Sequence, residues 1–199
     1  KQIYNINIYN NIYKLHLNSM DDILFYIKKF IPYYILLLII GCAPSPRLYN
    51  SIPIINIQNP IDHSNKKLKI GNIMGGELTN EIQGSKIDAF TFEAVLIESI
   101  KKYKIFLITD TYADYILNAT IMYQTQPLVG LDMTVNFMVK YSLINQNSNE
   151  EIWVKDIYSI YTAKFSDSFI GSERLNMANE GAIRKNIEIL LQTLTILEL

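Results

Sequence analysis

The stretch from residue 131 to residue 143 alternates between apolar and polar side chains. Successive side chains of a β-strand point to opposite faces, so this period predicts a strand with one buried and one wet face, as in an antiparallel sheet. Met138 is the one exception, because it is apolar at an otherwise polar position. The predicted core-facing set is Leu131, Met133, Val135, Phe137, Val139, Tyr141 and Leu143.

Four further segments have the pattern of strands. Residues 117–124 alternate in the same way, which predicts a core face made of Leu117, Ala119, Ile121 and Tyr123. Residues 66–77 predict a first strand with glycine interruptions, and the short apolar run 104–109 favours a central strand. Residues 152–163 are apolar on both faces, which indicates a bulge or cover by another element.

Helical spacing appears in two places. Residues 85–103 predict a helix that begins at a capping box of Ser85 and Asp88. Residues 172–197 predict a longer helix, with Glu180 and Arg184 as an ion pair on its outer side. The predicted apolar faces are Ile87, Phe90, Ala94, Ile97 and Ile100 in the first helix, and Leu175, Ala178, Ala182, Ile187, Leu190, Leu194 and Leu197 in the second.

The order of these elements predicts an α+β domain over residues 67–199. We expect an antiparallel β-sheet of four to five strands with two helices packed on one face. Residues 42–66 hold four prolines and no clear period, so we interpret them as a flexible linker; an ordered arm lying on the domain is the alternative.

The N-terminal part has the features of a leader. Residues 31–41 carry no charge and follow Lys28 and Lys29. Their length suits the core of a signal peptide, roughly 7–15 residues, better than a membrane span of roughly 20. We therefore predict a signal peptide at 20–41; an uncleaved anchor that includes 23–27 would place both lysines inside the membrane. Residues 1–19, rich in Asn, Ile, Tyr and Lys, are interpreted as a non-native upstream extension.

The single cysteine of the chain, Cys42, ends the motif Leu38-Ile39-Ile40-Gly41-Cys42. This motif resembles the lipobox of bacterial lipoproteins. The resemblance implies that the thiol carries a lipid such as palmitate, that the leader is removed and that Cys42 becomes the N-terminus. Ala43, in place of Asp, implies the periplasmic face of the outer membrane in a Gram-negative bacterium. A buried structural cysteine is the alternative.

A wider resemblance covers roughly residues 68–197. The sequence FIGSERLNMANEGAIRKNIEILL closes the strand pattern and, together with the lipobox, resembles small uncharacterised lipoproteins of proteobacteria. The element order is distantly similar to the curli secretion lipoprotein, to lipoproteins that activate penicillin-binding proteins and to the N-terminal domain of the Tol translocation protein. These resemblances imply an α/β fold and no active site.

Composition excludes several chemistries. The net charge of −1 gives no general attraction to nucleic acid, and one cysteine cannot form an internal disulfide. His16 and His63 lie outside the predicted domain, which excludes a histidine metal site or a Ser-His-Asp triad within it. Asp110 and Asp114 could bind a cation, but turn chemistry explains them better. We expect no metal and no cofactor.

The resulting hypothesis is a non-enzymatic one. The protein would be a lipid-anchored scaffold or accessory subunit in envelope assembly, with the membrane and another envelope protein as partners. Trp153, Arg174 and Arg184 are the predicted partner surface. A lipid- or glycan-binding module that uses the wet face of the sheet is the alternative, and a hydrolase or acyltransferase is disfavoured.

Overall fold

The computed structural model describes residues 25, 27–30, 47–56, 61–76 and 86–199. The chain forms two compact units, Lys1–Gly41 and Cys42–Leu199. In the first unit, Phe25 and residues 27–30 are helical and exposed. The predicted leader core at 31–41, the upstream segment 1–19 and Cys42 lie outside the described residues. No helix within the described ranges is both long enough and apolar enough to cross a membrane.

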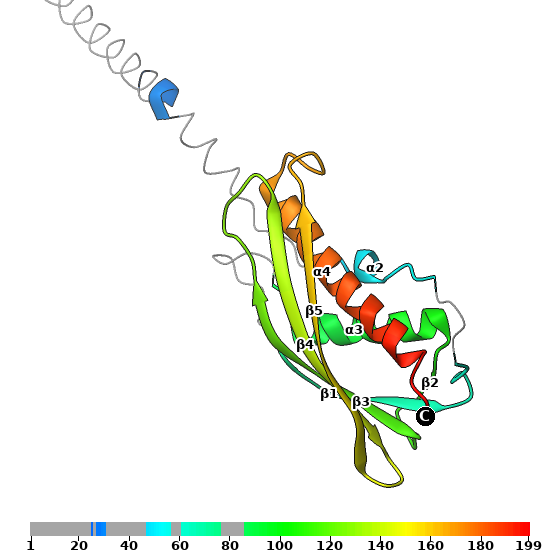
Figure 1. Ribbon diagram of the computed structural model, residues 1–199. Helices are drawn as coiled ribbons and strands as arrows, with labels where there is room; N and C mark the ends of the chain where they lie inside the picture. Colours follow the sequence, from blue (N-terminus) through cyan, green and yellow to red (C-terminus); the bar gives the residue numbers. More distant parts are fainter. Residues whose placement is uncertain (1–24, 26, 31–46, 57–60, 77–85) are drawn as a thin grey trace, which may run out of the picture. The chain divides into compact units, whose positions relative to one another are not determined.

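The second unit is built on a five-stranded mixed sheet with the order β2-β1-β3-β4-β5 (Figure 1). β3, β4 and β5 are antiparallel, whereas β1 runs parallel to both β2 and β3. The prediction of a purely antiparallel sheet is therefore wrong for β1 and β2. A helix joins β1 to β2. This crossover brings the chain back to the end of the sheet at which β1 begins, so β2 runs parallel to β1. The strands are β1 (Lys67–Gly75), β2 (Leu107–Ile108), β3 (Tyr115–Thr125), β4 (Met133–Asn145) and β5 (Glu150–Ala163).

The two predicted helices pack on one face of this sheet, which confirms the α+β class (Figure 1). They are α3 (Ala89–Tyr103) and α4 (Gly171–Leu194). A four-residue helix, α2 (Leu48–Ser51), packs against α4. β2 is an edge strand of two residues rather than the predicted central strand, because the apolar Ile105 and Phe106 are buried before the strand begins.

The alternation of β4 is confirmed, since every odd position from Met133 to Leu143 is buried. Leu131 precedes the strand and is exposed. The pattern fails at the end of β3, where the register shifts between Ile121 and Tyr123. This bulge turns Tyr123 to the open face and places Gln124 opposite Phe137, where the Gln124 side-chain oxygen accepts a hydrogen bond from the Ile87 backbone N–H (3.0 Å).

α3 begins later than predicted. Asp88 is its N-cap and accepts a hydrogen bond from the Thr91 backbone N–H (2.8 Å), while Ser85 lies outside the described residues. Phe90, predicted on the buried face, is exposed, so the face that packs on the core is rotated about the helix axis from the predicted one. The buried residues are Phe92, Val95, Leu96, Ser99 and Ile100.

α4 has the predicted buried stripe, except that Leu197 lies beyond its end. Near its middle the helix packs closely on β5: a Cβ placed on Gly181 would lie 2.3 Å from ring atoms of Tyr161. Farther along, the Tyr141 hydroxyl donates to Asn186 (2.7 Å), which donates in turn to the Ile157 carbonyl (2.8 Å). Burial raises the pKa of the Tyr141 hydroxyl well above its ordinary value.

The domain boundary lies earlier than predicted. His63, assigned to the linker, is buried and stacks on Phe106 with ring centroids 5.4 Å apart. Its Nε2 lies 3.0 Å from the Leu197 carbonyl oxygen, which can only accept, so Nε2 carries the hydrogen. Residues 47–56 also lie on the domain rather than forming a flexible linker.

Candidate functional site

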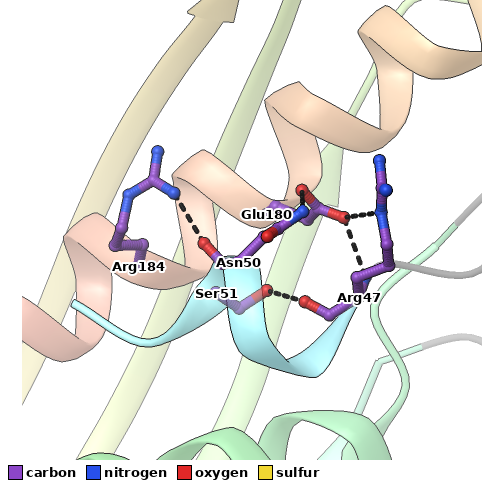
Figure 2. Close-up of polar contacts among 5 residues, drawn as sticks. All are labelled: Arg47, Asn50, Ser51, Glu180 and Arg184. Atoms are coloured by element: carbon purple, nitrogen blue, oxygen red, sulfur yellow. Dashed lines mark hydrogen bonds and ion pairs between the residues drawn. The ribbon is translucent and has the colours of Figure 1, made fainter.

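Residues 47–56, which we call the arm, are fixed to α4 by a buried carboxylate. Glu180 is only 2% exposed. Its Oε1 accepts from the Arg47 backbone N–H (2.8 Å) and lies 3.5 Å from the Arg47 Nε, while its Oε2 accepts from the Asn50 side chain (3.0 Å; Figure 2). A buried carboxylate is tolerated only when such donors replace its water. The three donor contacts therefore hold the beginning of the arm on the helix.

Arg184, one helical turn further along α4, binds the other end of α2. Its Nη1 donates to the Asn50 carbonyl oxygen (2.6 Å; Figure 2). Its guanidinium stacks over the Tyr161 ring, 5.5 Å from the ring centre. Ser51 adds a bond from its hydroxyl to the Arg47 carbonyl (3.2 Å). The carbonyl that α2 leaves unpaired is thus satisfied by a cation, as is favourable at a helix C-terminus.

The arm then crosses to α3. The Tyr103 hydroxyl donates to the Pro53 carbonyl (2.8 Å) and accepts from the Ile55 backbone N–H (2.8 Å). Lys102 donates to the same Pro53 carbonyl (3.0 Å). Ile52 and Ile55 pack against the core cluster. The alternative of an ordered arm, stated above for residues 42–66, therefore holds for residues 47–56.

A groove of about 570 Å³ lies where the arm meets the two helices. Its charged residues are Arg47, Lys102, Glu180, Arg184 and Glu188. Four of these bind the arm or are bound by it, so they form a structural junction rather than a reaction centre. Within the described part of the chain, no group of three or more His, Cys, Asp or Glu side chains could hold a metal.

Arg174 was predicted on the partner surface, and this is wrong because it is buried. Its Nη1 donates to the Ser168 carbonyl (2.7 Å) and its Nη2 to the Gly130 carbonyl (3.1 Å), so that it joins two loops. The guanidinium also lies 5.1 Å from the centre of the Phe165 ring. A side chain with these contacts is a structural tie and is not open to a partner.

The other predicted site residues have separate positions. Arg184 contacts the arm rather than pairing with Glu180, and Trp153 is half-buried on β5, where it packs against the core. Asp110 is exposed, whereas Asp114 accepts from the Lys67 backbone N–H (2.8 Å) at the start of β1, so it joins two strands rather than bonding within its own turn. The predicted partner surface is therefore not assembled by the fold.

No pattern in the sequence indicates the junction directly. Glu180 resembles an ordinary solvated acid of an amphipathic helix, and Arg47 and Asn50 lie in a proline-containing stretch.

No protein-family model matches this chain. The search of curated proteins also found no match. Among solved structures, the chain is similar to protein XCC0632 of Xanthomonas campestris, of the DUF330 family, with 10% identity over 72% of this chain and 93% of that one and a TM-score of 0.54. PelC of Paraburkholderia phytofirmans gives a TM-score of 0.45 with 14% identity over 71% of this chain and 95% of that one. A minor lipoprotein of Acinetobacter baumannii gives 0.39 with 16% identity over 68% and 90%.

These likenesses concern the fold. The match to the Xanthomonas protein shows a shared architecture at an identity too low to carry residue roles across. The expected resemblance to an uncharacterised proteobacterial family is confirmed at the level of the fold by the Xanthomonas protein.

Proposed function

We propose that this protein is a lipid-anchored, non-enzymatic component of the bacterial envelope, attached through Cys42 to the periplasmic face of the outer membrane. The observation that carries the proposal is the docking of the arm: the domain is fixed to its own N-terminal segment from Arg47 onward. Arg47 lies five positions after Cys42. Fully extended, the chain from Cys42 to Arg47 spans about 17 Å, so a lipid on Cys42 holds the domain against the membrane.

The chemistry of the described residues supports a contact function. Three buried polar side chains of α4, those of Glu180, Arg174 and Asn186, bind backbone groups. His63, the histidine of the folded unit, donates its Nε2 hydrogen to a carbonyl and stacks on an aromatic ring. These groups act as structural ties and leave no nucleophile with an adjacent base among them.

The partner surface that we propose is the edge strand β5. In the sheet order β5 pairs with β4 on one side, so its other edge presents backbone N–H and C=O groups to a partner strand. Four large apolar side chains on this strand are exposed: Ile152, Val154, Tyr158 and Ile160. Another envelope protein could add a strand here and cover these side chains.

Acylation is tested by growing cells with labelled palmitate. We expect label in the wild-type chain, none in Cys42→Ala, and release of Cys42→Ala from the membrane or its accumulation as uncleaved precursor. Equal label in both proteins would contradict lipid attachment at Cys42.

The docking surface is tested by substitution on β5. Ile160→Lys should leave the melting temperature unchanged and abolish co-purification of envelope partners with the acylated protein. Lys140→Gln, on the neighbouring strand, should preserve that co-purification.

A second candidate function, glycan binding, is favoured by two tyrosines on the open face of the sheet. The rings of Tyr123 and Tyr158 lie 6.5 Å apart and both are exposed. The Tyr158 hydroxyl donates to Asn136 (2.6 Å), which donates to Thr125 (2.9 Å). Aromatic faces beside amide and hydroxyl groups suit a sugar ring. A rise in melting temperature with peptidoglycan fragments, lost in Tyr123→Ala, would support this function.

A further inference from the structure

One end of the domain exposes six large apolar side chains on two loops. One loop joins β3 to β4 (126–132) and the other joins β5 to α4 (164–170). Met133 pairs with Ala163, so the two loops leave the same end of the sheet. Folded proteins rarely expose such a group of apolar side chains without a binding partner. We call these two loops the apolar tip; its exposed residues are Leu128, Val129, Leu131, Phe165, Phe169 and Ile170.

The tip is held by a rigid frame. Arg174 ties both loops through the Gly130 and Ser168 carbonyls, as described above. The Phe165 backbone N–H donates to Asp132 across the loops (2.9 Å), and the Phe165 and Phe169 rings meet edge to face at 5.3 Å. A buried cation that fixes both loops keeps these side chains directed outward, at a lower entropic cost of binding.

The tip lies close to the beginning of the arm. Arg174 and Glu180 are six residues apart on α4, which is about 9 Å along the helix axis. The arm is fixed at Glu180, and its first residue lies five positions after Cys42, a reach of about 17 Å. The length of the connecting chain therefore allows the attachment point to lie level with the tip.

We propose that the apolar tip inserts into the lipid bilayer that holds Cys42, so that the domain sits on the membrane in one orientation. This proposal rests on the lipid attachment proposed above. The ionisable residues of the tip and the first turn of α4 are Asp132, Lys164, Asp167, Glu173 and the buried Arg174. Asp132 and Asp167 accept backbone hydrogen bonds, from Phe165 and from Lys164 (2.8 Å). Lys164 is outnumbered by the three acids, so the tip has no cationic surface. It therefore binds the apolar part of the bilayer and needs no anionic lipid.

This orientation has a consequence for the partner surface. The strands leave the tip and run away from the membrane, so that β5 and the open face of the sheet stay accessible in the periplasm (Figure 1). A partner can then reach β5 while the domain remains seated.

The test uses the acylated full-length protein in phosphatidylcholine vesicles. Acylation consumes the thiol of Cys42, the one cysteine of the chain, so an introduced cysteine is the one site for a fluorescent label. The label is placed at Phe169→Cys and, as a matched control, at Phe90→Cys on α3, because both phenylalanines are 81% exposed. Flotation of the vesicles reports the anchor, and quenching by lipids with a nitroxide on the acyl chain reports the tip.

We expect both labelled proteins to float and the label at position 169 to be quenched several-fold more than the label at position 90. Replacement of Val129 and Leu131 by serine should reduce the quenching at 169 without preventing flotation. Flotation with equal quenching at both positions would overturn the tip proposal and leave the anchor intact. The label at position 169 could instead be shielded from solvent only at high protein density and not be quenched by the lipids. That result would assign the tip to contact between copies of the protein. Absence of flotation would overturn the anchor and the seating that depends on it.

Discussion

At the scale of single residues, Glu180 and Tyr141 are the two buried polar side chains whose removal has the clearest expected effect. Glu180 receives two hydrogen bonds from the arm. Tyr141 is buried in the core and bonds Asn186. Removing the Tyr141 hydroxyl leaves the buried Asn186 oxygen unsatisfied, which costs about 1–3 kcal/mol. Removing the Glu180 carboxylate instead releases Arg47, which is exposed, and Asn50, which is half-buried.

Glu180→Ala should free the arm. We expect trypsin to cleave after Arg47 much faster in this variant, because the Arg47 N–H and the Asn50 amide lose their acceptors. Glu180→Gln should give an intermediate rate, since its amide nitrogen would face the Asn50 donor. Glu188→Ala, on the same helix, is the control and should cleave like wild type. Equal cleavage in all four proteins would show that the carboxylate does not hold the arm.

The buried Tyr141 hydroxyl should make the free energy of unfolding depend on pH in the alkaline range. Its pKa is raised by burial, so above the ordinary pKa of about 10 the unfolded chain loses a proton that the folded chain keeps. The unfolded state is thereby favoured, and stability falls as the pH rises above that value. Urea unfolding at pH 8 and at higher pH should show a smaller alkaline loss in Tyr141→Phe than in wild type. An unchanged alkaline loss would contradict this assignment.

At the scale of elements, the contact of α4 with β5 depends on Gly181. A methyl group there would overlap the Tyr161 ring, so Gly181→Ala should destabilise the protein by about 1–3 kcal/mol. The same change made in a Tyr161→Ala background should cost much less, because the ring is gone. Chemical denaturation of the four proteins measures the coupling. An equal cost in both backgrounds would show that the ring is not the obstacle.

β4 provides a second test at this scale. Phe137→Asp places an unpaired charge in the core and should lower the free energy of unfolding by about 3–5 kcal/mol. Thr134→Lys, on the open face, should cost less than about 1 kcal/mol. Similar losses in the two variants would indicate that both faces of the sheet are covered.

The elements also show what a sequence pattern can predict. The alternation in β4 predicted its buried face correctly, because one strand obeys one period along its length. The parallel pairing of β1 was missed, since local periodicity does not say which strand lies alongside. Tyr123 was misplaced by a bulge, and Phe90 because α3 carries two overlapping apolar stripes, of which the one through Phe92 packs on the core. The junction at Glu180 was missed because it joins residues more than a hundred positions apart.

At the scale of the whole molecule, the arm and the apolar tip lie at neighbouring positions along α4. If both act at the membrane, the proposed lipid on Cys42 and the six exposed apolar side chains share one bilayer. Two weak membrane contacts acting together hold a protein far more firmly than either alone. The domain is then a rigid platform, with β5 available for another envelope protein.

The lipid on Cys42 is the central claim, and mass spectrometry of the native protein extracted from membranes tests it most directly. We predict an N-terminal peptide that begins at Cys42 and carries the mass of its acyl chains, with no peptide from residues 31–41 preceding it. A Cys42 peptide with a free thiol, joined to the preceding residues, would contradict the account.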